Sequence, residues 1–544
     1  MKSFRLRLTL ALLALAMIAV TIPAHAQTFS VLYNFSTSGG GPCYPGTGAA
    51  IAQGRDGTLY SAAYACGAIG YGAMFNITPS GTLTTPYSFD STDATPRSGL
   101  TLANDGNFYG TTSGEGTITA GTVYKLTPGG TVTILHTFAR SDGSQPFAPP
   151  IQGTDGNFYG TTSGGGTNNV GTVYKLIPSG TLTTLYSFGG ANGATPCAPL
   201  VQGADGNFYG TTYYGGVNGF GAIYKISPAG KYTLLYSFTG VSPDGAHPDY
   251  AALVQGTDGD FYGTTFLGGG PTNGGIVFKI TAAGALTVLH EFNGTDGSSP
   301  TAGLVQATDG NFYGTTPAGG SANIGVIFKI TPAGTYSVVY NFDGTTGKSP
   351  NVALVQHANG ILYGDTTMGG TGTNNAGVFY SLNIGATPFV RLVPSSAKVG
   401  RTVEILGQGF TGTTGVSFNG TAATFHVSSD TYLTTTVPAG AKTGYISVVT
   451  PGGTLKSNKT FRVTPQITSF NPSSGPVGTS VIIMGVSLTG ATKVTFGGVK
   501  ATAFTVNSDT QVTATVPTAA VTGKIAIITA GGTATNATSF TVTP

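Results

Sequence analysis

Asp105-Gly106-Asn107-Phe108-Tyr109-Gly110-Thr111-Thr112 is the stretch that decides the fold, because it recurs along the chain. Close copies begin at Asp155, Asp205, Asp258 and Asp309, and weaker copies occupy residues 56–63 and 359–366. Self-similarity at a fixed period indicates a repeat architecture. The tyrosines of the seven copies lie 49 to 53 residues apart, at Tyr60, Tyr109, Tyr159, Tyr209, Tyr262, Tyr313 and Tyr363.

Each repeat predicts four short strands. In the fourth repeat they are residues 199–202, 207–212, 221–226 and 232–238, with Gly, Pro and Asp between them as hairpins require. Four strands in about 50 residues make the unit of a propeller blade, and no helical period appears. The sequence therefore predicts an all-β protein whose residues 27–384 form a seven-bladed β-propeller.

The repeats also predict how the ring closes. The fourth-strand pattern L-Y-x-F occurs at residues 32–35, before the first complete repeat, whereas the seventh repeat ends at Leu382 without one. We therefore expect residues 29–35 to complete the last blade. This pairing removes two open sheet edges that would otherwise promote aggregation.

These units resemble the Gloeo/Verruco repeat of the choice-of-anchor tandem repeat GloVer-containing proteins. The match lies in G-L-V-Q-x-x-D-G-N-F-Y-G-T-T and the following V-Y-K-L-T-P-x-G, across roughly residues 28–383. The resemblance implies an exported or surface-attached bacterial protein of unassigned activity. Members end in varied anchoring signals, but residues 540–544 form no apolar tail, so we expect no helical or covalent anchor there.

A second repeat, with an offset of 78 residues, begins near Ala386. Pro394-Ser395-Ser396 returns as Pro472-Ser473-Ser474, and Val416-Ser417-Phe418 returns as Val494-Thr495-Phe496. Alternating apolar residues predict two small β-sandwiches, at residues 385–465 and 466–544. Their motif order resembles IPT/TIG domains, which occur in cell-surface receptors, extracellular bacterial enzymes and some transcription factors.

Residues 1–26 predict a secretory signal peptide. Lys2, Arg5 and Arg7 precede an apolar run at 8–20, and Ala24-His25-Ala26 is a cleavage site. A transmembrane helix is the alternative, but a run of about 13 residues is short of the roughly 20 that span a bilayer. Without this segment 20 basic residues balance 20 acidic ones, which disfavours nucleic acid and anionic membranes as partners.

The sequence has three cysteines, Cys43, Cys66 and Cys197, without the spacing of a zinc or redox site. We expect a disulfide between Cys43 and Cys66, because the loop before the first strand and the loop after the second share one face of a blade. Cys197 is expected to remain free.

No motif predicts a catalytic residue, a metal ligand or a cofactor site. Gly407 to Gly412 spells G-x-G-x-x-G, but a strand follows it instead of a helix, so nucleotide binding is disfavoured. The recurring Asp-Gly suits a two-residue hairpin with positive φ better than calcium ligation. Five lysines at one repeat position are interpreted as residues at strand ends whose stems cover apolar surface; they are Lys125, Lys175, Lys225, Lys279 and Lys329. The histidines at 136, 247, 290, 357 and 426 share no spacing, and His136 and His290 are interpreted as strand residues because they replace the Tyr of L-Y-x-F.

Variable loops, such as residues 142–146, 163–170 and 213–220, are predicted to share one face of the propeller. Variable loops on a constant scaffold favour recognition, although unconstrained loops vary too. The leading hypothesis is a non-catalytic extracellular scaffold that binds a glycan or a cell-surface protein. The alternatives are a polysaccharide lyase or hydrolase with carboxylates in the channel, and a purely structural surface protein. Clustered buried acids at a channel mouth would favour the enzyme, and an aromatic mouth would favour binding.

Overall fold

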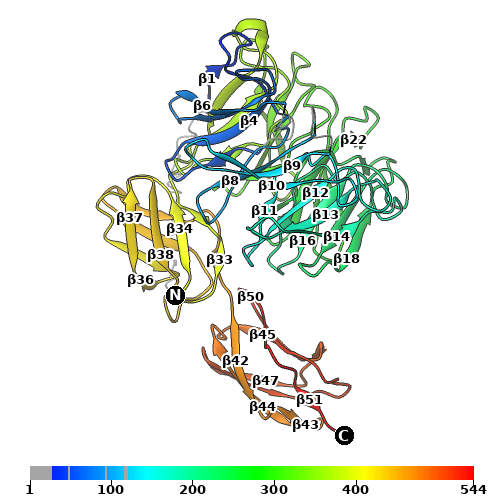
Figure 1. Ribbon diagram of the computed structural model, residues 1–544, viewed down its shortest axis with the longest axis vertical. Helices are drawn as coiled ribbons and strands as arrows, with labels where there is room; N and C mark the ends of the chain where they lie inside the picture. Colours follow the sequence, from blue (N-terminus) through cyan, green and yellow to red (C-terminus); the bar gives the residue numbers. More distant parts are fainter. Residues whose placement is uncertain (1–26, 47–49, 92–94, 115–119) are drawn as a thin grey trace, which may run out of the picture.

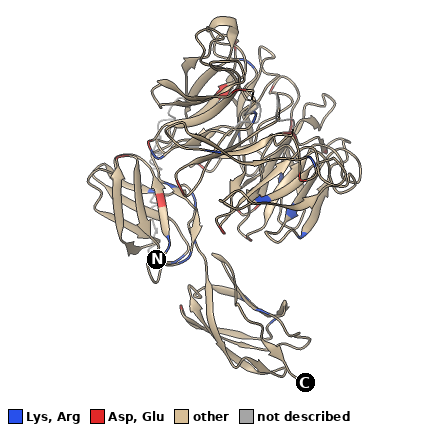
Figure 2. Cartoon of the chain, viewed as in Figure 1, with Lys and Arg blue, Asp and Glu red and all other residues tan. Residues whose placement is uncertain are grey.

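The computed structural model describes residues 27–46, 50–91, 95–114 and 120–544 (Figure 1). The predicted signal peptide lies outside these residues. The chain is all-β as predicted: the helical content of the described residues is one 3-10 turn, η1 (Thr373–Asn375). Within these residues no helix reaches the length and apolarity that a membrane span requires. Figure 2 shows how thinly charged residues are scattered over the strands.

The described residues between 28 and 383 form seven antiparallel sheets of four or five strands, numbered here in chain order, and one two-stranded ladder. Sheet 1 contains β2 (Pro42–Pro45), β3 (Ala52–Gln53), β4 (Leu59–Cys66), β5 (Ala73–Ile77) and β6 (Leu83–Ser88). Sheet 2 contains β7 (Thr101–Leu102), β8 (Phe108–Thr112), β9 (Thr122–Leu126) and β10 (Val132–Thr137). Sheet 3 contains β11 (Ile151–Gln152), β12 (Phe158–Thr162), β13 (Thr172–Leu176) and β14 (Leu182–Ser187).

The next three sheets repeat this order. Sheet 4 contains β15 (Val201–Gln202), β16 (Phe208–Thr212), β17 (Ala222–Ile226) and β18 (Tyr232–Ser237). Sheet 5 contains β20 (Val254–Gln255), β21 (Phe261–Thr265), β23 (Ile276–Ile280) and β24 (Leu286–Glu291), with a small ladder of β19 (Gly245–Ala246) and β22 (Leu267–Gly268) beside it. Sheet 6 contains β25 (Val305–Gln306), β26 (Phe312–Thr316), β27 (Val326–Ile330) and β28 (Tyr336–Asn341).

Sheet 7 joins the two ends of the repeat region. It contains β29 (Val355–Gln356), β30 (Leu362–Thr366) and β31 (Val378–Asn383), and its fourth strand is the N-terminal β1 (Thr28–Asn34). Thr28 pairs with Asn383 and Asn34 pairs with Val378, antiparallel. The predicted pairing of the N-terminal strand with the last repeat is confirmed.

Aromatic stacking joins one sheet to the next. The Tyr of the F-Y-G-T-T strand stacks on the Phe of the following sheet, as for Tyr159 and Phe208 at 3.9 Å between ring centroids. Leucine replaces Phe in sheets 7 and 1, where Leu59 shares a buried cluster with Tyr363. A Cβ on Gly210 would lie 2.6 Å from the Tyr224 hydroxyl oxygen, so this strand needs glycine where the tyrosine crosses it.

Glutamines at the ends of the first strands form a second link between sheets. The Oε1 atom of Gln202 accepts a hydrogen bond of 3.0 Å from the backbone N–H of Thr154 in sheet 3. The same bond recurs at Gln152, Gln255, Gln306 and Gln356. Gln53 of sheet 1 accepts the bond from Ala358 of sheet 7, so the last sheet contacts the first.

The first sandwich, residues 391–463, packs two four-stranded sheets around a shared apolar core. One sheet has β32 (Arg391–Val393), β34 (Thr402–Leu406), β38 (Tyr432–Thr436) and β37 (Phe425–Ser429). The other has β36 (Thr421–Ala423), β35 (Gly415–Phe418), β39 (Ile446–Thr450) and β40 (Gly453–Lys456). A short parallel ladder joins β33 (Ser396–Ala397) to β41 (Arg462–Val463).

The second sandwich, residues 466–542, repeats this topology. One sheet has β42 (Gln466–Asn471), β44 (Ser480–Val486), β48 (Gln511–Thr515) and β47 (Phe504–Ser508). The other has β46 (Val499–Lys500), β45 (Ala491–Phe496), β49 (Ile525–Thr529) and β50 (Gly532–Thr535), and β43 (Ser474–Gly475) pairs with β51 (Thr541–Val542).

The first sandwich docks on the turns that follow the first strands of the repeats (Figure 1). Arg55, in the first of these turns, forms an ion pair with Glu404 of β34, and its Nε donates a 2.9 Å hydrogen bond to Oε2. The Thr431 hydroxyl donates to the Arg55 carbonyl at 2.8 Å, and Phe389 N–H donates to the Ala358 carbonyl at 2.9 Å. The sandwich therefore covers one end of the repeat region.

Candidate functional site

The candidate site lies at the other end of the first strands, where each repeat enters its sheet. A buried proline opens each entry segment of repeats 2 to 7. The residue after that proline differs in every repeat: Arg97, Phe147, Cys197, Asp249, Thr301 and Asn351. Binding residues are often found at positions that vary while the surrounding scaffold stays the same.

Half-buried aromatic rings gather at these entry segments. Tyr250 of sheet 5 meets Phe147 of sheet 3 edge to face, with ring centroids 5.8 Å apart, although sheet 4 lies between them in the sequence. The guanidinium of Arg97 lies 5.8 Å from the centroid of the Tyr64 ring. Tyr213 stacks on His247 at 4.8 Å. We call Tyr64, Arg97, Phe147, Tyr213, Asp249 and Tyr250 the aromatic mouth.

The titratable groups at the aromatic mouth are partly or fully buried and lie close enough to shift one another's pKa values. Burial raises the pKa of Asp249 to about 7, although a backbone N–H from Tyr250 opposes the shift. Burial also raises the pKa of the Cys197 thiol, and the nearby Asp249 charge adds to this, so the thiol stays protonated. The pKa of Tyr250 is raised by burial and by Cys197 and Asp249, while Arg97 lowers it. The site thus combines flat apolar rings with one carboxyl, one guanidinium and several phenols.

One signal in the sequence could have identified this site. The fifth repeat reads Pro248-Asp249-Tyr250-Ala251-Ala252-Leu253, one residue longer than the Pro-x-x-x-Leu segment of the fourth repeat at 196–200. Tyr250, within this longer segment, contacts Phe147.

The structure joins Cys43 and Cys66 by a disulfide, with their Cα atoms 5.4 Å apart. The bond links neighbouring strands of sheet 1, since Cys43 lies in β2 and Cys66 ends β4. Cys197 is unpaired and buried at the aromatic mouth.

The Asp-Gly pairs form turns, but not the predicted two-residue hairpins. Only the glycine has positive φ, as at Gly206 with φ of 82°. The loop is longer, closed by hydrogen bonds from Gly203 N–H to the Asn207 carbonyl and from Gly206 N–H to the Gly203 carbonyl. The Asp205 carboxylate accepts hydrogen bonds from Asn207 and from the Tyr209 hydroxyl at 2.9 Å. These carboxylates thus hold the turn against the strand, a role that the sequence interpretation missed.

Several of the repeated lysines and of the histidines have structural partners. Lys175 Nζ lies 3.8 Å from Asp155, beside the turn, and Lys279 Nζ lies 3.6 Å from Asp260. His136 and His290 lie in strands as predicted, and each also contacts an aspartate of the next loop. His357 is buried, with Nε2 3.0 Å from the Gly57 carbonyl oxygen.

His426 is on β37 of the first sandwich. The G-x-G-x-x-G segment leads into strand β35. Across the described residues, no group of three His, Cys, Asp or Glu side chains is placed to hold a metal ion.

Comparison with known proteins identifies the two kinds of repeat. The model of the Gloeobacter/Verrucomicrobia repeat matches residues 19–150, 96–308 and 241–422. The IPT/TIG domain model matches residues 389–463 and 465–542. No protein of curated function matches the chain.

Several solved structures match part of this chain at low identity. A copper-containing fungal alcohol oxidase is 14% identical over 78% of this chain and 99% of its own, with a TM-score of 0.43. A Xanthomonas campestris gluconolactonase is 14% identical over 55% of this chain and 88% of its own, with a TM-score of 0.34. The surface glycan-binding protein PbSGBP-B from Prevotella bryantii is 21% identical over 27% of this chain and 38% of its own, with a TM-score of 0.22.

Proposed function

Because this chain belongs to the Gloeobacter/Verrucomicrobia repeat family and carries two IPT/TIG domains, we propose that it is an exported scaffold that binds glycans through the aromatic mouth. In this proposal residues 27–384 are one seven-bladed propeller and the two sandwiches are spacers. Seven units of four or five strands, joined from the seventh back to the first by β1 and by Gln53, support the closed ring.

The aromatic mouth is the observation that carries the glycan proposal. Sugar rings present apolar C–H faces with hydroxyls at their edges, so they suit a surface of flat rings with a few polar groups. Phe147 and Tyr250 supply crossed rings, while Arg97 and Asp249 supply a donor and a carboxyl beside them. These rings are already packed against one another, so little side-chain freedom is lost on binding.

Asp249 favours one second candidate, a polysaccharide lyase or hydrolase. A carboxyl with a pKa of about 7 is suited to proton transfer near neutral pH. Glycoside hydrolysis, however, usually needs two carboxyl groups on either side of the scissile bond, and Asp249 is the one carboxyl of the aromatic mouth. We therefore place binding first.

The test is a glycan screen with protein comprising residues 27–544. Binding should fall about 30-fold or more in Tyr250→Ala and Phe147→Ala, the loss typical when a central aromatic contact of about 2 kcal/mol is truncated. Tyr445→Ala is the matched control, because Tyr445 is an exposed aromatic residue of the first sandwich, 37% accessible. Absence of any glycan ligand, or equal affinity in all four proteins, would refute the proposal.

The same glycans should be assayed for cleavage products. If the parent protein cleaves one of them and Asp249→Asn abolishes turnover while binding persists, the second candidate is correct. If the protein neither binds nor cleaves any glycan, a protein ligand or a purely structural role remains.

A further inference from the structure

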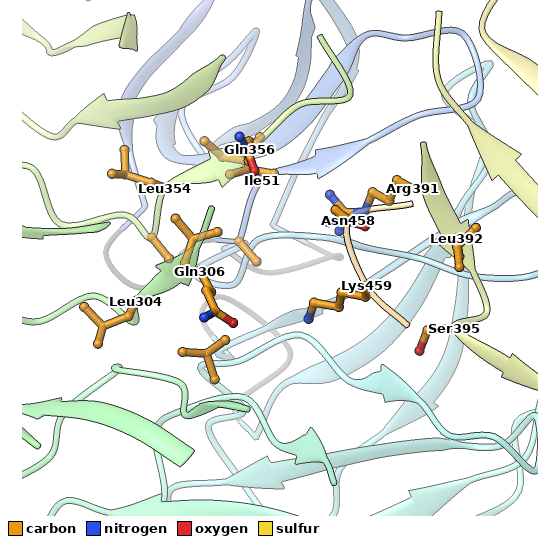
Figure 3. A pocket seen from close by; sticks show the side chains of 15 residues that line it. Ile51, Leu304, Gln306, Leu354, Gln356, Arg391, Leu392, Ser395, Asn458 and Lys459 are labelled. Atoms are coloured by element: carbon orange, nitrogen blue, oxygen red, sulfur yellow. The ribbon is translucent and has the colours of Figure 1, made fainter. Parts of the chain in front are cut away.

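A cavity of about 320 Å³ lies between the repeat region and the first sandwich. Its walls come from the first strands of the sheets and from the residues just before them, including Leu304, Val305 and Gln306. Its lid comes from the sandwich, with Arg391, Asn458 and Lys459 (Figure 3). This volume is at the lower end of the roughly 300–1,000 Å³ of small-molecule sites.

The lid brings cationic side chains into the cavity. Figure 3 shows Lys459 extending across the cavity toward Gln306, with Arg391 beside Asn458. Arg391 is half-buried, whereas the Lys459 side chain keeps an exposed surface. Arg391 opens strand β32 and Lys459 lies between β40 and β41, so two separate segments of the sandwich supply the charges.

No carboxylate balances these charges within the cavity, since its lining, taken from the described residues, contains neither Asp nor Glu. The protein atoms that surround the Lys459 side chain in the cavity lower its pKa, and the charges of Arg391 and Arg462 lower it further. Burial lowers the pKa of Arg391 as well. Arg462, in contrast, interacts with the Asp205 carboxylate, which raises its pKa against the effect of burial.

We propose that this cavity binds a small oxyanion, a carboxylate or a phosphate, between Arg391 and Lys459. An anion there relieves the repulsion between the two cations and accepts charge-assisted hydrogen bonds from the guanidinium fork and the ammonium. The lining also contains the amides of Gln306, Gln356 and Asn458, and the two glutamines are held by hydrogen bonds to neighbouring sheets. This second site is independent of the aromatic mouth.

The experiment titrates D-glucuronate, inorganic phosphate and neutral D-glucose into protein comprising residues 27–544, by calorimetry at low salt. We expect one equivalent of at least one anion to bind with a Kd below about 1 mM, and D-glucose not to bind at this site. Glucuronate and phosphate distinguish the two oxyanion classes. Affinity should fall as salt is raised, because ions screen the accessible Lys459.

Two lysine variants provide the control. Lys459→Gln should weaken anion binding at least tenfold, while Lys442→Gln, which removes an exposed lysine of the same sandwich outside the cavity, should not. Arg391→Lys keeps the charge but removes the guanidinium fork, and should also weaken binding. Tyr250→Ala should leave anion affinity unchanged. Absence of binding by both anions, or equal affinity in Lys459→Gln and Lys442→Gln, would overturn the proposal.

Discussion

Replacing Phe35 with alanine tests whether the N-terminal strand closes the ring in solution. Phe35 follows β1, is fully buried, and meets Phe75 of sheet 1 edge to face at 5.4 Å. Phe188 occupies the same position of the third repeat, is equally buried, and meets Tyr224 of the next sheet at 5.2 Å. Truncating a buried Phe to Ala costs about 3–5 kcal/mol of unfolding free energy. We expect a loss of this size in both variants.

Urea unfolding followed by the near-UV circular dichroism of tyrosine is a suitable assay. The chain has no tryptophan, and 24 of its 26 tyrosines precede residue 385, so the signal reports mainly on the repeats. The midpoint should shift while the slope stays constant, because the amount of surface exposed on unfolding does not change. If Phe188→Ala costs about 3–5 kcal/mol but Phe35→Ala costs less than about 1 kcal/mol, the N-terminal strand is not docked.

Three further predictions follow from the chemistry of the chain. The disulfide between Cys43 and Cys66, with a sequence separation of 23, should add about 3 kcal/mol to the free energy of unfolding. A reductant should therefore lower the free energy of unfolding of the parent protein by this amount and should have no effect on Cys43→Ser. Burial raises the pKa of Asp249 from 3.8 to about 7, so the folded protein retains a proton that the unfolded chain releases. The free energy of unfolding should therefore fall as pH rises from about 4 to 7, and Asp249→Asn should reduce this slope in urea titrations at each pH. Protein recovered outside the cytoplasm should begin at Gln27, and an intact Met1 in its mass spectrum would contradict cleavage after Ala26.

The repeated strands could be predicted from sequence because their side chains contact equivalent partners in every repeat. The strands of the fourth sheet begin and end within two residues of their expected positions. Counting fourth-strand patterns also predicted that β1 pairs with β31. These contacts are periodic, so the pattern of one repeat contains the information for all of them.

The aromatic mouth and the cavity could not be predicted in this way, because each depends on residues that interrupt the period. Tyr250 and Phe147 are 103 positions apart and meet only when the entry segments converge. Arg55 is the one charged residue at its repeat position, where the other copies have Asn, Thr or Ala. The reason for an arginine at this position is found only in the structure, where Arg55 forms an ion pair with Glu404 of the first sandwich.

The pairing of β1 with β31 has a consequence for the order of synthesis. Thr28 is among the first residues of the described chain to be made, yet its partner Asn383 follows 355 residues later. At about 5–20 residues per second, the partner strand is completed roughly 20–70 s after β1. For that interval the segment of β1, with the sequence Thr-Phe-Ser-Val-Leu-Tyr-Asn, has no β31 with which to pair. A ribosome that stalls within the repeats, or a protease that cuts before the seventh sheet, therefore leaves a chain that has all its early sheets and no means of closing.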